Sequence, residues 1–298
     1  MKQVLITGGS GFIGRQVTQK FLEQGYEVTV INKSSYLPPI NGLNVVHLDL
    51  FDEIKVNAFM QAHHFKYMIH LAWYIGPKCH SDNINFSWLQ ASINLLRAFH
   101  KNGGCKFLGA GTVSEYDFSY GLLQEDKTPL HNPSLHGQCK AAFYHTASIF
   151  CQQNGIEFKW ARIFNLYGPY ERRSRLMPSV INSMLKNEDV KVSNCEKFQD
   201  YLHVFDTANG IYTLFESNLQ GATNICSAQP IYLRNIVKKI SELVNFKGEI
   251  LWGSIPASFS NNIIVGCNDK LKSLGWKPKY DLETGLKETI DWWRTHNV

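Results

Sequence analysis

The first half of the chain alternates short runs of β-branched and apolar residues with longer amphipathic stretches. The amphipathic stretches predict helices, for example over 13–24, 83–101 and 138–154. Strands separated by helices indicate a parallel sheet covered on both faces, and right-handed crossovers make such a sheet doubly wound. The predicted strands are 4–7, 28–31, 45–48, 67–71, 106–109 and 158–163.

The pattern changes after about Gly168, where prolines begin to separate shorter elements. We therefore expect an α/β fold with two parts, a dinucleotide-binding Rossmann domain at 1–168 and a smaller α/β substrate-binding part at 169–298. The second part should pack over the carboxyl ends of the strands. The stretch 201–210 has the pattern of a return to the main sheet, so a return segment is expected near 200–215.

Composition is that of an ordinary globular protein. Apolar residues make up 44% of the 298 residues and charged residues 18%, and no apolar run reaches the length of about 18 that a spanning helix needs. The first residues run directly into a strand pattern, without the regions of a signal peptide. Seven scattered cysteines, none in a Cys-x-x-Cys pair, are typical of reduced thiols. We expect a cytoplasmic protein without a membrane span.

The net charge and the histidine content limit which kinds of ligand are expected. The net charge of +5 is dispersed, which argues against nucleic acid but suits an anionic small substrate. The eleven histidines show no ligand spacing with each other or with cysteine, so no metal site is expected.

A glycine-rich turn follows the first predicted strand and opens the first predicted helix. Gly8 allows the tight turn, Gly11 lets the backbone approach a pyrophosphate, and Gly14 lets the helix pack against the strand. The helix N-terminus presents free N–H groups and a positive dipole to the phosphates. The residues of this predicted dinucleotide site are Thr7, Gly8, Ser10, Gly11, Phe12, Ile13 and Gly14.

This turn resembles that of the extended short-chain dehydrogenase/reductase family, which includes nucleotide-sugar epimerases, dehydratases and reductases. The family has Thr-Gly-Gly-x-Gly-Phe-Ile-Gly there, and residues 7–14 match it. Residues 162–169 resemble the family's Arg-x-Phe-Asn-x-Tyr-Gly-Pro segment, and 274–278 its Leu-Gly-Trp-x-Pro turn. The resemblance spans nearly the whole chain, and it implies a nucleotide-diphosphate sugar as substrate and a homodimer.

The end of the second predicted strand favours NADP over NAD. NAD binders usually carry an acidic residue there for the ribose 2′-hydroxyl, whereas this chain has Asn32, Lys33 and Ser34. A carboxylate would repel a 2′-phosphate, but amide, ammonium and hydroxyl groups donate hydrogen bonds to it. The resemblance implies further cofactor contacts at Asp49, Leu50, Leu71, Ala72 and Lys140.

The resemblance also locates the candidate catalytic positions. Thr112 stands where the family has a Ser or Thr that hydrogen-bonds the substrate oxygen. The family then has Tyr-x-x-x-Lys on one helix face; Lys140 is present, but His136 replaces the tyrosine. Three interpretations stay open: His136 does the tyrosine's work, another acid such as Tyr116, Tyr74 or water does it, or catalysis is lost. An imidazolium acid predicts a rate that falls as pH rises through the neutral range.

The residues after Thr112 argue against two of the family's reactions. Dehydratases carry an Asp-Glu pair directly after this position and decarboxylases a glutamate two residues after it, but this chain has Val113 and Ser114. A preference for NADP suggests a hydride that is consumed. We therefore expect NADPH-dependent reduction of a nucleotide-linked 4-keto-6-deoxy sugar, with hydride delivered to C4. An NAD-dependent epimerase and a catalytically impaired NADP(H) sensor are the alternatives.

Substrate contacts are expected mainly from the second half. By resemblance, Asn165 contacts the sugar diphosphate, and the arginine-rich turn after it has the chemistry of a diphosphate clamp. Gln199 stands where the family has an arginine that often binds substrate phosphate, which leaves the nucleotide open. The expected substrate-binding residues are Tyr74, Thr112, Asn165, Arg172 and Arg175.

Overall fold

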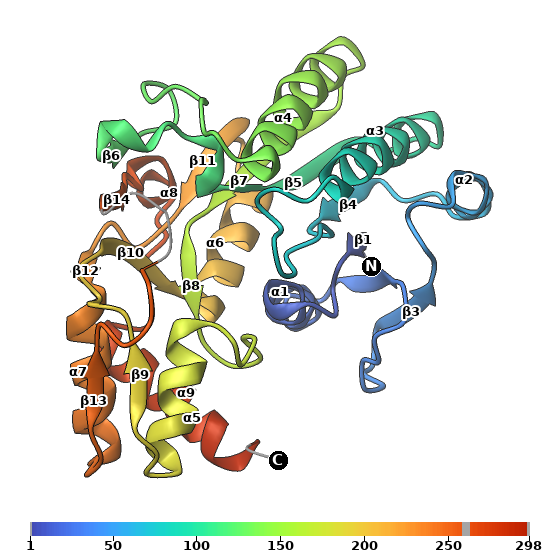
Figure 1. Ribbon diagram of the computed structural model, residues 1–298. Helices are drawn as coiled ribbons and strands as arrows, with labels where there is room; N and C mark the ends of the chain where they lie inside the picture. Colours follow the sequence, from blue (N-terminus) through green and yellow to red (C-terminus); the bar gives the residue numbers. More distant parts are fainter. Residues whose placement is uncertain (1, 258–262, 297–298) are drawn as a thin grey trace.

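The computed structural model describes residues 2–257 and 263–296 of the chain. Its main element is a seven-stranded, wholly parallel sheet with the strand order β11-β7-β5-β4-β1-β2-β3 (Figure 1). The α/β doubly wound fold expected from the sequence is therefore confirmed. The strands are β1 (Gln3–Thr7), β2 (Glu27–Asn32), β3 (Leu43–His47), β4 (Tyr67–His70), β5 (Lys106–Thr112), β7 (Glu157–Ile163) and β11 (Gly221–Ile225).

Helices cover both faces of this sheet because alternate strand residues point to opposite sides. Val4 and Ile6 pack with α1 and α6 on one face, while Leu5 packs with α2, α3 and α4 on the other. Each face thus has its own apolar core. The covering helices are α1 (Phe12–Glu23), α2 (Glu53–Ala62), α3 (Ile84–Lys101), α4 (Leu135–Gln153) and α6 (Val204–Glu216).

The second half builds a smaller body around a third apolar core, to which α5, α7 and α9 contribute. Figure 1 shows these elements gathered on one side of the main sheet, in yellow to red. Its larger sheet contains β6 (Leu122–Leu123), β8 (Asn165–Tyr167), β10 (Phe198–His203), β12 (Pro230–Tyr232) and β14 (Ile263–Gly266). The other elements are α5 (Leu176–Leu185), β9 (Val190–Val192), α7 (Leu233–Val244), β13 (Ile250–Trp252), α8 (Asp269–Ser273) and α9 (Leu282–Thr295).

The stretch 200–215, where a return to the main sheet is expected, holds the end of a strand of the smaller sheet and most of a helix that covers the main sheet. Strand β10, which contains Tyr201, pairs with β8, β12 and β14 of the smaller sheet. The chain returns through α6, which packs against α1, and then through β11, which pairs in parallel with β7. Strand β11 is the seventh strand, and the sequence pattern did not predict it. Within the described residues, no helix combines the length and apolar character needed to cross a membrane.

Candidate active site

The glycine-rich turn joins β1 to α1 and presses against the end of β4. Gly8 has a φ of +72°, and a Cβ there would lie 2.8 Å from the backbone nitrogen of Ala72. A Cβ on Gly14 would lie 2.0 Å from the carbonyl oxygen of Gly8, so only glycine lets the helix begin this close. Gly11 caps α1 without a side-chain hydrogen bond, which leaves the first-turn N–H groups to a ligand. This cradle fits a dinucleotide pyrophosphate.

The other turn residues support this cradle. The Thr7 hydroxyl lies 2.7 Å from Nδ1 of His70 and accepts a hydrogen bond from the backbone N–H of Ala72, at 3.3 Å. It therefore ties β1 to the end of β4. Ser10, Phe12 and Ile13 are half-buried along the turn.

The end of β2 carries an unpaired amide. Asn32 is buried, and within the described residues neither its Nδ2 nor its Oδ1 has a hydrogen-bond partner. Buried amides are rarely left so, which suits a ligand at this strand end. Lys33 forms a 2.7 Å ion pair with Asp49, and this contact lowers the pKa of the Asp49 carboxyl. Lys33 is thus held beside a carboxylate rather than free, while Ser34 is exposed.

Arg15 is a second cation at this place, and its role was not predicted from the sequence. Nε of Arg15 donates to the carbonyl oxygen of Ser10 at 2.9 Å, and Nη2 donates to that of Tyr36 at 3.4 Å. The guanidinium therefore bridges the phosphate turn and the segment after β2. The Tyr170 ring lies 5.0 Å from it, which brings the substrate half against α1. The available signal was the position of Arg15 directly after Gly14.

Thr112 ends β5 and caps the short 3₁₀ helix Val113–Glu115 that follows. Its backbone N–H donates to Glu115 at 2.8 Å, and its Oγ1 accepts from the Ser114 N–H at 3.2 Å. The Glu115 carboxylate also forms a 2.8 Å ion pair with Arg162, and both side chains are buried. This carboxylate is therefore committed to structure and closed to substrate.

His136 and Lys140 lie one turn apart near the start of α4, which packs closely on the 3₁₀ helix. A Cβ on Gly137 would lie 1.7 Å from the carbonyl oxygen of Ser114. His136 and Lys140 are both buried, at 6% and 4% exposure. Lys140 Nζ donates to the carbonyl oxygen of Ala110 in β5 at 2.6 Å. The structure thus brings both residues to the carboxyl end of β5.

Burial decides the charge of both groups. It lowers the pKa of Lys140 from 10.5 to about 7. It also lowers the pKa of His136 to about 3, and the nearby Lys140 charge contributes to that shift. A neutral imidazole at neutral pH disagrees with the expected imidazolium acid. Lys140 is the group of the pair that titrates in the neutral range.

An aromatic cover over Lys140 was not anticipated from the sequence. Nζ lies 4.0 Å from the centroid of the Trp73 ring, which is itself 8% exposed. The same indole meets the His136 ring edge-on at 6.1 Å and stacks on Trp88 at 6.2 Å. Trp73 follows the segment after β4 that was expected to run beside the cofactor, so it forms one wall of the site.

Tyr116 and Tyr74, the two side chains considered as alternative acids, differ in how exposed they are. Tyr116 is fully buried, donates to Asn224 at 2.7 Å and accepts from Arg162 at 3.1 Å. Burial raises the pKa of the Tyr116 hydroxyl, so this residue is unsuited to proton delivery. Tyr74 is half-buried, and its hydroxyl donates to the carbonyl oxygen of Pro77 at 3.1 Å.

Of the predicted substrate residues, Arg172 and Arg175 lie on the turn before α5, whereas Asn165 lies on β8. Arg172 is exposed, and its Nη1 donates to the carbonyl oxygen of Ile75 at 2.5 Å, so the arginine-rich turn meets the segment that carries Tyr74. Arg175 is exposed and lies 3.7 Å from the buried Glu171. Burial raises the pKa of Glu171 to about 8.

Asn165 belongs to the smaller sheet. It lies on β8, half-buried, and donates to the carbonyl oxygen of Asp200 at 3.3 Å. Two predicted cofactor residues, Leu50 and Leu71, pack against the two apolar cores of the main sheet.

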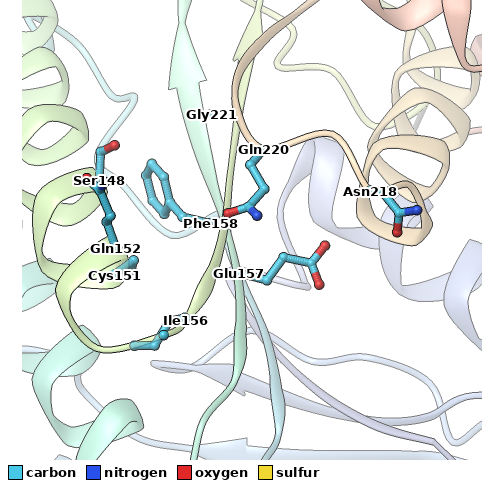
Figure 2. Close-up of a pocket in the computed structure, with 10 residues that line it drawn as sticks. Ser148, Cys151, Gln152, Ile156, Glu157, Phe158, Asn218, Gln220 and Gly221 are labelled. Carbon is cyan, nitrogen blue, oxygen red and sulfur yellow. The ribbon is translucent and has the colours of Figure 1, made fainter.

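A pocket of about 740 Å³ lies at the other end of the main sheet (Figure 2). It is lined by Glu157 and Phe158 at the amino end of β7, by Gly221 at the amino end of β11, and by Cys151 near the end of α4. Parallel sheets bind ligands at their carboxyl ends, so this pocket is not the cofactor site. Within residues 2–257 and 263–296, no three His, Cys, Asp or Glu side chains are grouped to hold a metal ion.

Comparisons with solved structures agree with this fold. UDP-glucose 4-epimerase from Thermotoga maritima, solved with UDP-glucose, superposes with a TM-score of 0.90 at 24% identity, covering 99% of this chain and 100% of that one. UDP-glucose 4-epimerase from Thermus thermophilus, solved with NAD, has a TM-score of 0.87 at 24% identity, covering 98% and 99%.

Sequence comparisons give relatives of several activities. UDP-glucuronic acid decarboxylase 1 of Xenopus tropicalis is 27% identical over 98% of this chain and 72% of its own length. A putative UDP-glucose 4-epimerase of Methanocaldococcus jannaschii is 24% identical over 99% of both chains. GDP-L-fucose synthase 1 of Arabidopsis thaliana is 26% identical over 98% of this chain and 93% of its own length.

The family model that matches covers most of the chain. It is described as the NAD dependent epimerase/dehydratase family, and the match runs over residues 4–226, from β1 to the end of β11. The chain belongs to the NAD dependent epimerase/dehydratase family.

Proposed function

We propose that the chain binds NADP(H) at the carboxyl edge of the main sheet and reduces a nucleotide-linked 4-keto-6-deoxy sugar, with hydride delivered to C4. The observation that carries this proposal is the end of β2. The unpaired Asn32 amide lies there with the Lys33 cation, and Arg15 bridges the phosphate turn to the segment that follows. The one carboxylate of this group, Asp49, is paired with Lys33, so a net positive charge remains for a 2′-phosphate.

The relatives support a nucleotide-linked sugar as substrate. Those named above are a UDP-glucuronic acid decarboxylase, a putative UDP-glucose 4-epimerase and a GDP-L-fucose synthase. The decarboxylase reaction is disfavoured because Val113 and Ser114 supply no carboxylate, and Glu115 is held by Arg162. The position of Arg172, against the segment that carries Tyr74, supports a diphosphate site between the two halves.

The chain's own residues divide the chemical work as follows. A bound nicotinamide supplies the hydride. The Thr112 hydroxyl orients the substrate oxygen. Lys140 is the source of the proton, because an ammonium with a pKa of about 7 is a competent acid at neutral pH, whereas His136, with a pKa of about 3, is already neutral.

The direct test follows the absorbance of NADPH with dTDP-4-keto-6-deoxyglucose and then with its GDP and CDP analogues. Lys140→Met should abolish turnover, while His136→Tyr should retain or increase it. For the native chain, the rate should fall as pH rises past about 7. Oxidation of NADH but not NADPH would contradict the cofactor assignment. Tight NADP binding without turnover of any sugar would favour the impaired sensor instead.

An NAD-dependent epimerase is the second candidate, and the neutral His136 favours it. A neutral imidazole can accept the proton of a sugar hydroxyl, which is how a reaction that begins with oxidation must start. This candidate predicts that NAD is retained through purification and that a UDP-sugar is inverted at C4 without net oxidation of cofactor. Proton NMR of the sugar would distinguish it from the reductase.

The proposal includes a cytoplasmic homodimer, expected from the family resemblance. Sedimentation of the purified chain tests the assembly, because a monomer at micromolar concentration would contradict it.

A further inference from the structure

A buried asparagine lies at the centre of the site, on a helix that the mechanism above does not use. Asn85 is the second residue of α3 and is fully buried. Its Nδ2 donates to the carbonyl oxygens of Cys79 and Asp82, both at 2.7 Å. Its Oδ1 accepts from Nε1 of Trp73 at 2.9 Å and lies 3.2 Å from Nδ1 of His136.

The orientation of this amide follows from its partners. Backbone carbonyls only accept hydrogen bonds, so the NH₂ group must face Cys79 and Asp82. An indole N–H only donates, so the amide oxygen must face Trp73. Reversing the amide would break three contacts at once. The atom that faces His136 is therefore the oxygen, which is an acceptor.

The tautomer of His136 follows in turn. An amide oxygen bonds to the ring nitrogen only if that nitrogen carries a hydrogen, so Nδ1 is the N–H of the ring. In a neutral imidazole the other nitrogen, Nε2, then has a lone pair and no hydrogen. Among the described residues, two titratable groups influence this ring: Lys140, one turn along α4, and His80 from the loop before α3, whose ring lies 5.9 Å away edge-on. Both disfavour a second proton on His136.

We propose that Asn85 is a positioning residue that holds His136 as the neutral Nδ1–H tautomer and makes its Nε2 a hydrogen-bond acceptor for a substrate hydroxyl or water. This inference rests on the proposed function only in placing His136 beside the substrate. It separates the role of His136 from that of the family's tyrosine, which carries its proton on the oxygen facing the substrate. His136 orients a hydroxyl, and the proton of the reduction comes from another group.

The test is ¹⁵N NMR of the histidine rings in the full chain at neutral pH, with the signals of His136 identified by their loss in His136→Gln. The native chain should show a protonated Nδ1 and an unprotonated Nε2. Asn85→Leu removes the acceptor and should move the ring toward the Nε2–H form, which free neutral histidine prefers. Trp73→Phe, the matched control, removes the other donor to the same oxygen and should leave the tautomer unchanged.

A second variant covers the case in which Asn85→Leu does not fold. Asn85→Asp has nearly the same shape, keeps an acceptor on Nδ1–H and should raise the pKa of His136, because a carboxylate favours the imidazolium. An Nε2–H ring in the native chain, or an Asn85→Leu ring that remains Nδ1–H, would overturn the inference.

This measurement needs neither cofactor nor substrate, so it fails independently of the proposed function. An Nδ1–H ring in a chain that turns over no sugar would sink the reductase and leave the inference intact. An Nε2–H ring in a chain that reduces a sugar would overturn the inference and leave the reductase proposal intact.

Discussion

At the scale of single residues, burial has more influence than charge on the candidate active site. Among the described residues, no carboxylate forms an ion pair with Lys140; Nζ bonds to the Ala110 carbonyl and lies over the rings of Trp73 and, at 5.9 Å, Trp160. Desolvation is therefore poorly offset, and the pKa of Lys140 falls to about 7. A residue in this state is a source of instability below that pH and a usable acid near it.

Lys140 should leave a mark on the pH dependence of stability. Between about pH 7 and pH 10.5 the unfolded chain holds a proton on Lys140 that the folded chain has lost, so the free energy of unfolding rises with pH in this window. Lys140→Met has no proton to lose at this position, so its free energy of unfolding lacks this rise. Any advantage in stability that the variant has over the native chain at pH 7 should therefore shrink as the pH increases toward 10.5. Urea denaturation at a series of pH values measures it. Lys127→Met, at an exposed site, is the control; a Lys140→Met difference as constant as the control's would contradict the prediction.

Arg15 should separate the two dinucleotides. If NADP binds as proposed, Arg15→Ala removes a cation from the side of the site that would receive the 2′-phosphate. A charged hydrogen bond contributes about 1.5–3 kcal/mol, so NADP affinity should then fall roughly tenfold to hundredfold. NAD affinity should change little. Calorimetric titration with both dinucleotides measures this, with Lys20→Ala removing the same charge elsewhere on α1. Equal losses for NADP and NAD would mean that Arg15 only shapes the turn.

Sequence reasoning located the residues that follow a spacing rule and missed those placed by tertiary contact. The glycines of the phosphate turn were predicted because backbone geometry dictates their spacing, whereas the Lys140 position was predicted from the family resemblance. Trp73 and Asn85 obey no such rule, and Arg15 was overlooked although it directly follows Gly14. Their roles depend on which side chains α3, α4 and the turn after β8 bring together, and a short loop sequence does not encode that visibly.

At the scale of elements, the site depends on how closely α4 approaches the end of β5. Ser134 caps this helix by accepting from the Gly137 N–H at 3.1 Å. Gly137 then lies against the carbonyl oxygen of Ser114, where no side chain fits. The predicted helix began three residues later, at 138, because the pattern alone does not reveal that His136 and Gly137 are helical.

Gly137→Ala should lower both stability and turnover, although helix propensity alone predicts a gain in stability. Alanine favours a helix by about 1 kcal/mol over glycine, but its Cβ would lie 1.7 Å from the Ser114 oxygen. The overlap must win, since backbone has to move, and we expect a net loss of about 1–3 kcal/mol together with loss of turnover. Denaturation and kinetics measure both. Thr146→Ala, exposed on the same helix, should be neutral; a Gly137→Ala variant that is equally neutral would contradict the observed packing.

Strand β11 shows why some strands are not predicted from the hydrophobic pattern. β11 reads Gly-Ala-Thr-Asn-Ile, with Thr223 and Asn224 both fully buried. Asn224 is buried because it bonds to Tyr116 and to the carbonyl oxygens of Leu123 and Cys267. A strand whose buried interior positions are threonine and asparagine has no apolar run to detect.

At the scale of the whole molecule, the two halves are not independent along the chain. The main sheet takes its edge strand, β11, and one of its covering helices, α6, from beyond Gly168. Phe215 of α6 lies edge-on to Phe21 of α1 at 5.2 Å, within the core of that face. A cut at the point where the sequence pattern changes would therefore remove one strand and one covering helix from the main sheet.

A fragment of residues 1–168 should accordingly fail to fold cooperatively, because it exposes the core under α6 and leaves β7 without its partner strand on the outer side. A fragment of residues 1–226 restores both elements and should show a single thermal transition by circular dichroism. A cooperative transition in the shorter fragment would show that α6 and β11 are dispensable.

The position of β11 also has a consequence for synthesis on the ribosome. After the end of β7, the 62 residues from Phe164 to Ile225 must be synthesised before β11, the strand that pairs with its outer side, is complete. At about 5–20 residues per second, β7 waits roughly 3 to 12 s with a row of free backbone N–H and C=O groups on its outer side. During that interval the nascent chain is a template for pairing with a neighbour, and its yield in a cell should depend on chaperones that cover this edge.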